Sequence, residues 1–255
     1  MMKIEKEYIN DIPVLLVAKE ESRQEKRPLL IFYHGFTSAK EHNLHYAYYL
    51  AERGFRVALP DAKLHGERSK GYNQKQLSLR FWNIVMKSIA EAESIKEALV
   101  KKGLVDEDRI GMAGTSMGAI TMLGAMTQYD WIKAGASMMG SPVYVQFAKY
   151  QVEELRKYNY ELPYTKEELN HQFEMLEPYD LSLAPDKLKG RPLFFWHGRK
   201  DVVVPFHYAY EFYTRLKERH EDEGQDLTFI DDLDAGHQVT RAGVLQMVQW
   251  LLEKV

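Results

Sequence analysis

The chain has 255 residues, and 34 lysines and arginines against 37 aspartates and glutamates give it a formal net charge of -3 at pH 7. This balance excludes the basic surface that binding to nucleic acid or to an anionic membrane requires. The absence of cysteine excludes disulfides, thiolate metal sites and a cysteine nucleophile. We therefore expect a small-molecule partner, and neither nucleic acid nor a membrane.

The N-terminal residues are charged, and no apolar run approaches the length of a signal sequence core or a membrane span. A chain of this length can bury one large core. We expect a cytoplasmic protein with a single domain over residues 1–255. The sequence leaves its oligomeric state open.

Apolar runs of strand length alternate with helical patterns along the chain. Residues 3–9 and 12–18 are expected to form an antiparallel pair around the Asn10-Asp11 turn. Further strands are expected at residues 28–33, 55–59, 109–113, 134–139, 192–196 and 227–233. Apolar residues recur at helical spacing in residues 38–52, 74–101, 119–126 and 206–219 and from residue 244 onward. Ser38 and Glu41 match a capping box at the start of the first of these segments. The alternation predicts an α/β fold with a mostly parallel central sheet flanked by helices.

One long segment, residues 141–190, does not fit a single crossover helix. Residues 143–157 and 165–176 have helical patterns separated by Pro163, and Thr165 with Glu168 forms a second capping box. We interpret this segment as a small helical cap inserted over the active site.

The sequence Gly114-Thr115-Ser116-Met117-Gly118 has the form Gly-x-Ser-x-Gly. Chance would produce this pattern in a chain of this size roughly one time in ten. Here it follows a strand-length apolar run and opens a helical pattern, as the sharp turn that presents a nucleophilic serine requires. Ser116 is the predicted nucleophile, and the alternative is an ordinary helix-capping serine.

A serine nucleophile needs a histidine base and an acid that holds the tautomer of that base, in the chain order serine, acid, histidine. Asp201 follows the strand at 192–196, and His237 follows the last strand after a Gly turn. The competing acids are Asp231, Asp232 and Asp234. We predict a catalytic triad of Ser116, Asp201 and His237.

The oxyanion of an acyl-transfer intermediate needs two N–H donors. The pattern assigns them to the backbone amides of Met117, after the nucleophile, and Phe36, in the loop after the strand at 28–33. His34 is expected to brace this loop. Residues 61–68 form another loop at the same sheet edge, for which a structural role is favoured.

Four motifs occur in this order: His34-Gly35-Phe36, the serine motif, Gly198-Arg199-Lys200-Asp201 with Val204-Pro205, and Ala235-Gly236-His237. With them, nearly the whole chain resembles the α/β-hydrolases, and more narrowly the small bacterial carboxylesterases of the YitV type, which are related to the prolyl-oligopeptidase-like hydrolases. The resemblance implies ester hydrolysis through an acyl-enzyme, without a metal or organic cofactor. Ala119 stands where many relatives have Gly, and the cap matches no substrate-specific pattern.

The cap is rich in aromatic residues: Tyr144, Phe147, Tyr150, Tyr158, Tyr160, Tyr164, Phe173 and Tyr179. We predict that Tyr144, Phe147, Tyr150 and Phe173 line the substrate pocket, the alternative being that the rings only fasten the cap to the sheet. A closed pocket predicts small esters with short acyl chains, with activity falling beyond roughly four to eight carbons.

Two other functions stay open beside the carboxylesterase. One is a peptidase of the prolyl-oligopeptidase kind, and the other is a binding scaffold of the same fold without catalysis. An acidic residue in place of Ser116 would have indicated a haloalkane dehalogenase of this fold.

Overall fold

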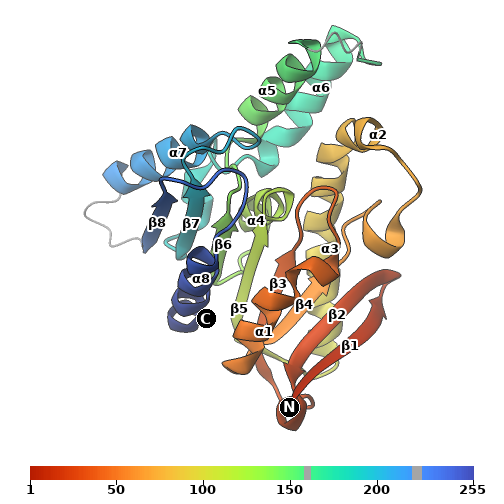
Figure 1. Ribbon diagram of the computed structural model, residues 1–255, viewed down its shortest axis with the longest axis vertical. Coiled ribbons are helices and arrows are strands. Elements are labelled where there is room, and N and C mark those ends of the chain that lie inside the picture. Colours follow the sequence, from red (N-terminus) through yellow and green to blue (C-terminus); the bar gives the residue numbers. More distant parts are fainter. Residues whose placement is uncertain (158–161, 220–225) are drawn as a thin grey trace.

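The computed structural model describes residues 1–157, 162–219 and 226–255. These residues form an eight-stranded sheet with the order β1-β2-β4-β3-β5-β6-β7-β8 (Figure 1). The strands are β1 (Met2–Ile9), β2 (Ile12–Lys19), β3 (Arg27–Tyr33), β4 (Arg56–Pro60), β5 (Val105–Thr115), β6 (Ala134–Met138), β7 (Leu193–Gly198) and β8 (Leu227–Asp232). β2 is antiparallel to β1 and β4, whereas β3 to β8 are paired in parallel. The predicted fold class, a mostly parallel α/β sheet, is confirmed.

Helices cover both faces of this sheet. They are α1 (Leu44–Glu52), α2 (Gln74–Ser78), α3 (Phe81–Lys101), α4 (Met117–Gln128), α5 (Tyr144–Lys157), α6 (Lys166–Leu176), α7 (Phe206–Arg219) and α8 (Arg241–Lys254). None of the helices in the described part of the chain is long and apolar enough to span a membrane.

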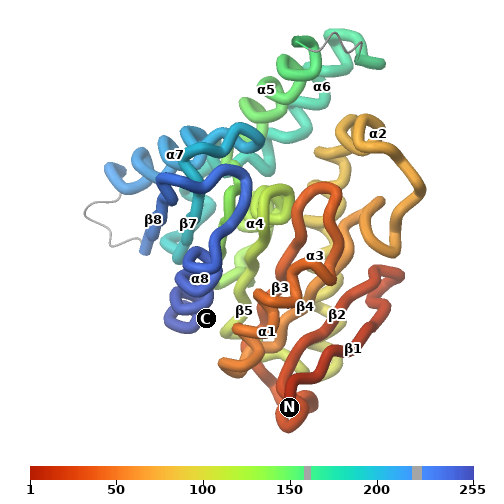
Figure 2. Tube along the Cα trace, viewed as in Figure 1, coloured from red at the N-terminus to blue at the C-terminus, as the bar shows by residue number. Residues whose placement is uncertain are grey.

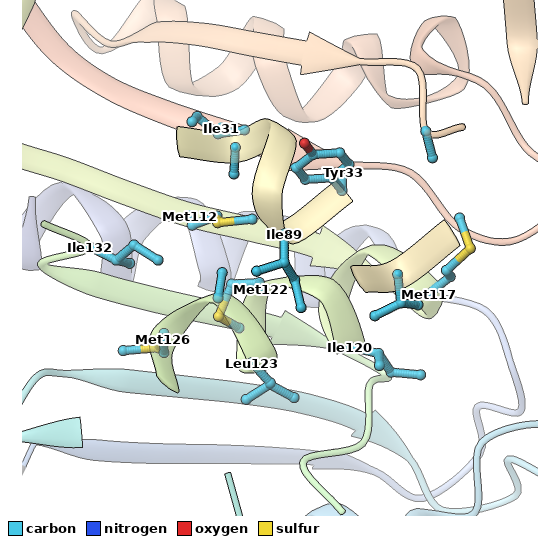
Figure 3. Close-up of a cluster of buried hydrophobic side chains, with 14 of the residues drawn as sticks. Ile31, Tyr33, Ile89, Met112, Met117, Ile120, Met122, Leu123, Met126 and Ile132 are labelled. Atoms are coloured by element: carbon cyan, nitrogen blue, oxygen red, sulfur yellow. The ribbon is translucent and has the colours of Figure 1, made fainter. Parts of the chain in front are cut away.

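The core has two layers because the inner strands of the sheet are buried on both faces. Helices α1 and α8 pack on one face, and α3, α4 and α7 pack on the other. Figure 3 shows how Ile31 of β3 and Met112 of β5 meet Ile89 of α3 and Met122 of α4 in the second layer. All four side chains are almost wholly buried, and each contributes roughly 1.5–3 kcal/mol to the hydrophobic stabilisation. This packing fixes α4, and with it the serine that precedes it.

The segment predicted as one helix at residues 38–52 differs in its first turn. A 3-10 turn covers Lys40–Asn43 before α1, and its cap residue is Ala39, without a side-chain cap. The Ser38 capping box is therefore wrong. The amide of Lys40, which a capping side chain would satisfy, donates instead to Asp61 Oδ1 at 3.1 Å. An acid distant in sequence replaces the local cap.

The long helical pattern at residues 74–101 is also divided. α2 ends at Ser78, and α3 begins at Phe81. The apolar spacing continues across this break, so the sequence did not reveal it. By contrast, the capping box of Thr165 and Glu168 at the start of α6 is confirmed.

The predicted insertion between β6 and β7 contains the helical hairpin α5–α6. Figures 1 and 2 show that this hairpin projects beyond the sheet edge at which β5 and β6 end. Because the carboxyl ends of parallel strands meet at one edge, the loops after β3, β5, β7 and β8 gather beneath it.

Candidate active site

Ser116 lies at a sharp turn between the end of β5 and the start of α4. Its backbone has φ +50° and ψ -114°, a strained combination for a residue other than glycine. The turn is held by hydrogen bonds, since the Ser116 amide donates to the Met138 carbonyl and its own carbonyl accepts from the Ile120 amide, both at 2.9 Å. The strain is therefore balanced by the sheet on one side and the helix on the other.

The two glycines of the motif allow this turn to sit directly on β3. A β-carbon added to Gly118 would lie 2.0 Å from the Tyr33 carbonyl oxygen, and one added to Gly114 would lie 2.4 Å from the Gly118 carbonyl carbon. Real side chains do not approach backbone atoms so closely, so only glycine fits at either position. Backbone contact between β3, β5 and α4 thus sets the position of Ser116.

A continuous hydrogen-bond chain leads from Ser116 to Asp201. The Ser116 hydroxyl lies 2.9 Å from His237 Nε2, and His237 Nδ1 lies 2.7 Å from Asp201 Oδ2. Since the carboxylate accepts from Nδ1–H, the neutral imidazole presents Nε2 as an acceptor toward the hydroxyl. The structure brings together all three side chains predicted for the triad, in hydrogen-bonding order.

Asp201 is buried, and every contact of its carboxylate favours the charged form. Oδ1 accepts from the Val203 and Val204 amides at 2.9 and 3.0 Å. Oδ2 is shared, because His197 Nε2 lies 3.2 Å from the same oxygen that contacts His237. Burial alone would raise the pKa of Asp201, but the hydrogen bonds from His197 and His237 outweigh it and hold this pKa well below its usual range. The carboxylate is therefore ionised at neutral pH.

His197 is a site residue that sequence reasoning missed. Its side chain is buried, and Nε2–H donates to the Val204 carbonyl at 2.8 Å as well as facing Asp201. Its position four residues before Asp201 was the available signal, because the turn at Gly198 folds the two side chains together.

The three competing acids have other partners. Asp231 pairs with Arg199 at 2.5 Å, and Asp234, 93% exposed, pairs with Lys200 at 2.8 Å. Asp232 Oδ1 accepts from the amides of residues 234 and 235 and so shapes the turn before His237. Asp201 is the acid that the fold places against the histidine.

His34 is fully buried behind the loop that carries Phe36. Its Nδ1–H donates to the Gly35 carbonyl at 2.8 Å, and its Nε2 accepts from the Ala62 amide at 3.0 Å. These contacts confirm the predicted bracing role and require the neutral ring. Burial lowers the pKa of His34 to about 4.

This buried histidine predicts a dependence of stability on pH. The unfolded chain has a histidine pKa of about 6.5, so below that pH the unfolded state binds a proton that the folded state resists. The free energy of unfolding should keep this contribution above about pH 6.5 and lose it as the pH falls toward 4, by at most about 1.4 kcal/mol per pH unit.

Urea unfolding midpoints measured through this interval test the prediction. In the variant His34→Gln, stability should fall less between pH 6.5 and pH 4 than in wild type. The variant His171→Gln, at an exposed histidine on α6, should lose stability over this interval as wild type does. Identical pH dependence in wild type and His34→Gln would contradict the assignment.

The loop at residues 61–68 is structural, as favoured from the sequence. Asp61 Oδ2 accepts from Lys40 Nζ at 2.7 Å and from the Glu67 amide at 3.0 Å, and Lys40 also contacts the Glu67 carboxylate at 2.6 Å. Arg68 forms two hydrogen bonds of 2.8 Å with Glu91 of α3. This network ties the loops after β3 and β4 together.

A cavity of about 580 Å³ opens between Ser116, α3 and the α5–α6 hairpin. Phe147, Tyr150 and Phe173, all predicted as pocket residues, are among its lining residues. Tyr144 is not, which corrects the prediction: it is fully buried, and its hydroxyl donates to the Ile120 carbonyl. Gly124 of α4 provides the space, since a β-carbon there would collide with the Tyr144 ring.

Of the other cap aromatics, Tyr164 also lines the cavity, and Tyr179 packs against the core instead. Tyr158 and Tyr160 lie outside the described residues. The sequence missed much of the contribution of the main domain, which includes Phe36, Leu79, Phe81, Trp82, Met86 and the exposed pair Val202 and Val203. These residues come from α3 and three loops, and only the folded chain brings them beside the cap.

Comparison with known proteins finds relatives over most of the chain. Residues 41–255 match the model of the prolyl oligopeptidase family. The chain is 48% identical to a Bacillus subtilis (strain 168) protein named "Putative esterase YitV", over 98% of each chain. It is 33% identical to Esterase YjfP of Escherichia coli (strain K12), over 88% of each chain.

The fold is also similar to the crystal structure of TT1662 from Thermus thermophilus, with a TM-score of 0.76, 22% identity and 99% of each chain covered. The chain belongs to the prolyl oligopeptidase family and is a hydrolase with the α/β-hydrolase fold.

Proposed function

We propose that this hydrolase is a serine carboxylesterase that cleaves uncharged small-molecule esters through an acyl-enzyme on Ser116. The observation that carries the proposal is the hydrogen-bond chain from Asp201 through His237 to the Ser116 hydroxyl, at the base of a cavity of ligand size. The esterase names of the two relatives support the ester as the substrate class.

The chemistry follows from the protonation states of these groups. His237 Nε2 takes the Ser116 proton as Oγ attacks the ester carbonyl carbon, and Asp201 stabilises the imidazolium that forms. The imidazolium then returns the proton to the leaving alkoxide, which departs as the alcohol. Water, deprotonated by the same Nε2, attacks the acyl carbon of the acyl-enzyme. The bond from this carbon to Ser116 Oγ then breaks, Oγ takes the proton back from the imidazolium, and the carboxylic acid leaves. Each proton is returned, so the enzyme ends in its starting state.

The developing oxyanion requires donors beside Ser116, and the Met117 and Phe36 amides are proposed for this role. Met117 is the first residue of α4, so its N–H has no partner within the helix and lies at the positive end of the helix dipole. The loop that carries Phe36 touches the nucleophile, since a β-carbon on Gly35 would lie 3.6 Å from the Ser116 β-carbon. These two positions support the proposal that both amides donate to the oxyanion.

Labelling with a fluorophosphonate probe tests the proposal. Ser116 and Ser78 both line the cavity, but only Ser116 contacts a histidine, whereas the Ser78 hydroxyl donates to the Gln74 carbonyl. We expect one label per chain, mapped by mass spectrometry to Ser116, and retained in Ser78→Ala but lost in Ser116→Ala.

An unlabelled wild-type protein would contradict the proposal and favour a binding scaffold. The peptidase alternative is separated by a second assay, which compares a p-nitrophenyl ester with the p-nitroanilide of the same acyl group and with a proline-containing peptide anilide. Turnover of an anilide in preference to the ester would overturn the carboxylesterase assignment.

A further inference from the structure

The cavity beside Ser116 extends along helix α5. Phe147 near the start of α5 and Leu155 two turns later both line it. The α5–α6 hairpin itself projects away from the sheet edge (Figure 1). These two positions are eight residues apart, so the lined length of α5 is about 12 Å at a rise of about 1.5 Å per residue. The cavity is elongated along the cap rather than confined to the immediate vicinity of the serine.

This length exceeds what a short acyl group uses. An extended chain advances about 1.2 Å per bond, so about 12 Å accommodates roughly ten bonds. The volume of 580 Å³ lies in the middle of the range that holds ligands of drug size. The expectation of short acyl chains rested on a closed pocket of finite depth, with a limit at roughly four to eight carbons, and the lined length of this cavity exceeds that limit.

The lining also limits the charge of the occupant. Among the described residues that line the cavity, none is a lysine or arginine. The single ionised side chain there is Glu154, whose carboxylate pairs with Lys157 at 2.6 Å. Transferring an anionic group into apolar surroundings without a cation is costly. A substrate with a carboxylate or phosphate at the far end of its chain is therefore disfavoured.

Most of the far end is apolar. Val152 and Leu155 from α5 line this part of the cavity together with Leu169 and Phe173 from α6. Each methylene that enters it can leave water for an apolar environment. Affinity should consequently increase with chain length until the lined space ends.

We propose that the cavity binds one uncharged alkyl or aryl-alkyl chain of medium length, about eight to twelve carbons, on the acyl or the alcohol side of the ester. The inference rests on the proposed function of Ser116. It replaces the expected preference for short esters with a preference set by the length of α5.

Two substrate series test this. One consists of p-nitrophenyl esters from acetate to hexadecanoate, and the other of acetates of alcohols from ethanol to hexadecanol. In at least one series, kcat/KM should be highest near the decanoyl or decyl member. Replacing that chain with one of equal length that ends in a carboxylate should lower kcat/KM about tenfold or more.

The variant Val152→Trp places a large ring in this far part of the cavity. It should lower kcat/KM for the medium chain relative to acetate by about tenfold and move the optimum to shorter chains. Leu155→Gln, which keeps a similar size but is polar, should weaken the preference for the longest accepted chains. The matched control is Glu153→Trp, at an exposed position of α5 that does not line the cavity.

The outcomes separate this inference from the proposed function. Failure of fluorophosphonate to label the wild-type protein would contradict both the proposed function and the inference about the cavity. Normal labelling with an optimum at acetate or butyrate in both series, or an optimum that neither cavity variant moves, would overturn the substrate class and leave the esterase in place.

Discussion

Replacing His237 with alanine is expected to lower kcat for p-nitrophenyl acetate by about 10⁶, and Ser116→Ala by a similar factor. The Ser116 hydroxyl contacts His237 Nε2 at 2.9 Å, and without the imidazole no other side chain in the described part of the chain is placed to take the hydroxyl proton. Without the hydroxyl, no acyl-enzyme can form. Steady-state kinetics with matched protein concentrations provide the measurement.

The double variant distinguishes a shared role from separate ones. Members of a triad act as one unit, so Ser116→Ala/His237→Ala should be no slower than either single variant. Alanine at His207, an exposed histidine on α7, serves as the control and should retain wild-type kcat. A double variant that is much slower than both singles would show that the two residues act independently, against the proposed mechanism.

Asp201→Asn is expected to lower kcat by about 10⁴ while the protein stays folded. The asparagine oxygen can still accept from the Val203 and Val204 amides, so the side chain keeps its place. Its NH₂ group would then face His237 Nδ1, which must become the acceptor. The imidazole proton moves to Nε2 and points at the Ser116 hydroxyl, so the base is lost.

The control for this variant is Asp234→Asn. Asp234 is exposed and pairs with Lys200, so its variant should keep wild-type activity, and circular dichroism should show both proteins folded. If Asp234→Asn were inactive and Asp201→Asn active, the acid would have been assigned to the wrong loop.

Much of the fold and the hydrogen-bonded triad could be predicted because local patterns determine them. The glycines at 114 and 118 are required by backbone contact, and Asp201 and His237 follow strands whose apolar runs are plain in the sequence. Parallel strands then place these loops at one edge without further information. The order of the motifs along the chain was sufficient to choose Ser116, Asp201 and His237.

The features that the sequence did not predict correctly are not determined by local patterns, because each depends on a partner distant in sequence. Asp61 replaces the capping box expected at Ser38. Tyr144 is buried in the core because Gly124 of α4 leaves room for its side chain. The cavity walls contributed by Trp82 and Val203 lie on segments with no sequence relation to the cap. Helical spacing identifies which face of α5 is apolar, but not whether that face meets a neighbouring helix or a substrate.

The backbone contact at Gly118 has a consequence for how this enzyme can change. Ser116, Asp201 and His237 all lie outside residues 141–190, and close contact with the Tyr33 carbonyl fixes the serine turn. Substitutions in the hairpin therefore leave the reacting atoms where they are and alter only what reaches them. Such a chain can acquire a new substrate range in small steps through its cap, each step retaining turnover, while the serine turn tolerates almost no variation.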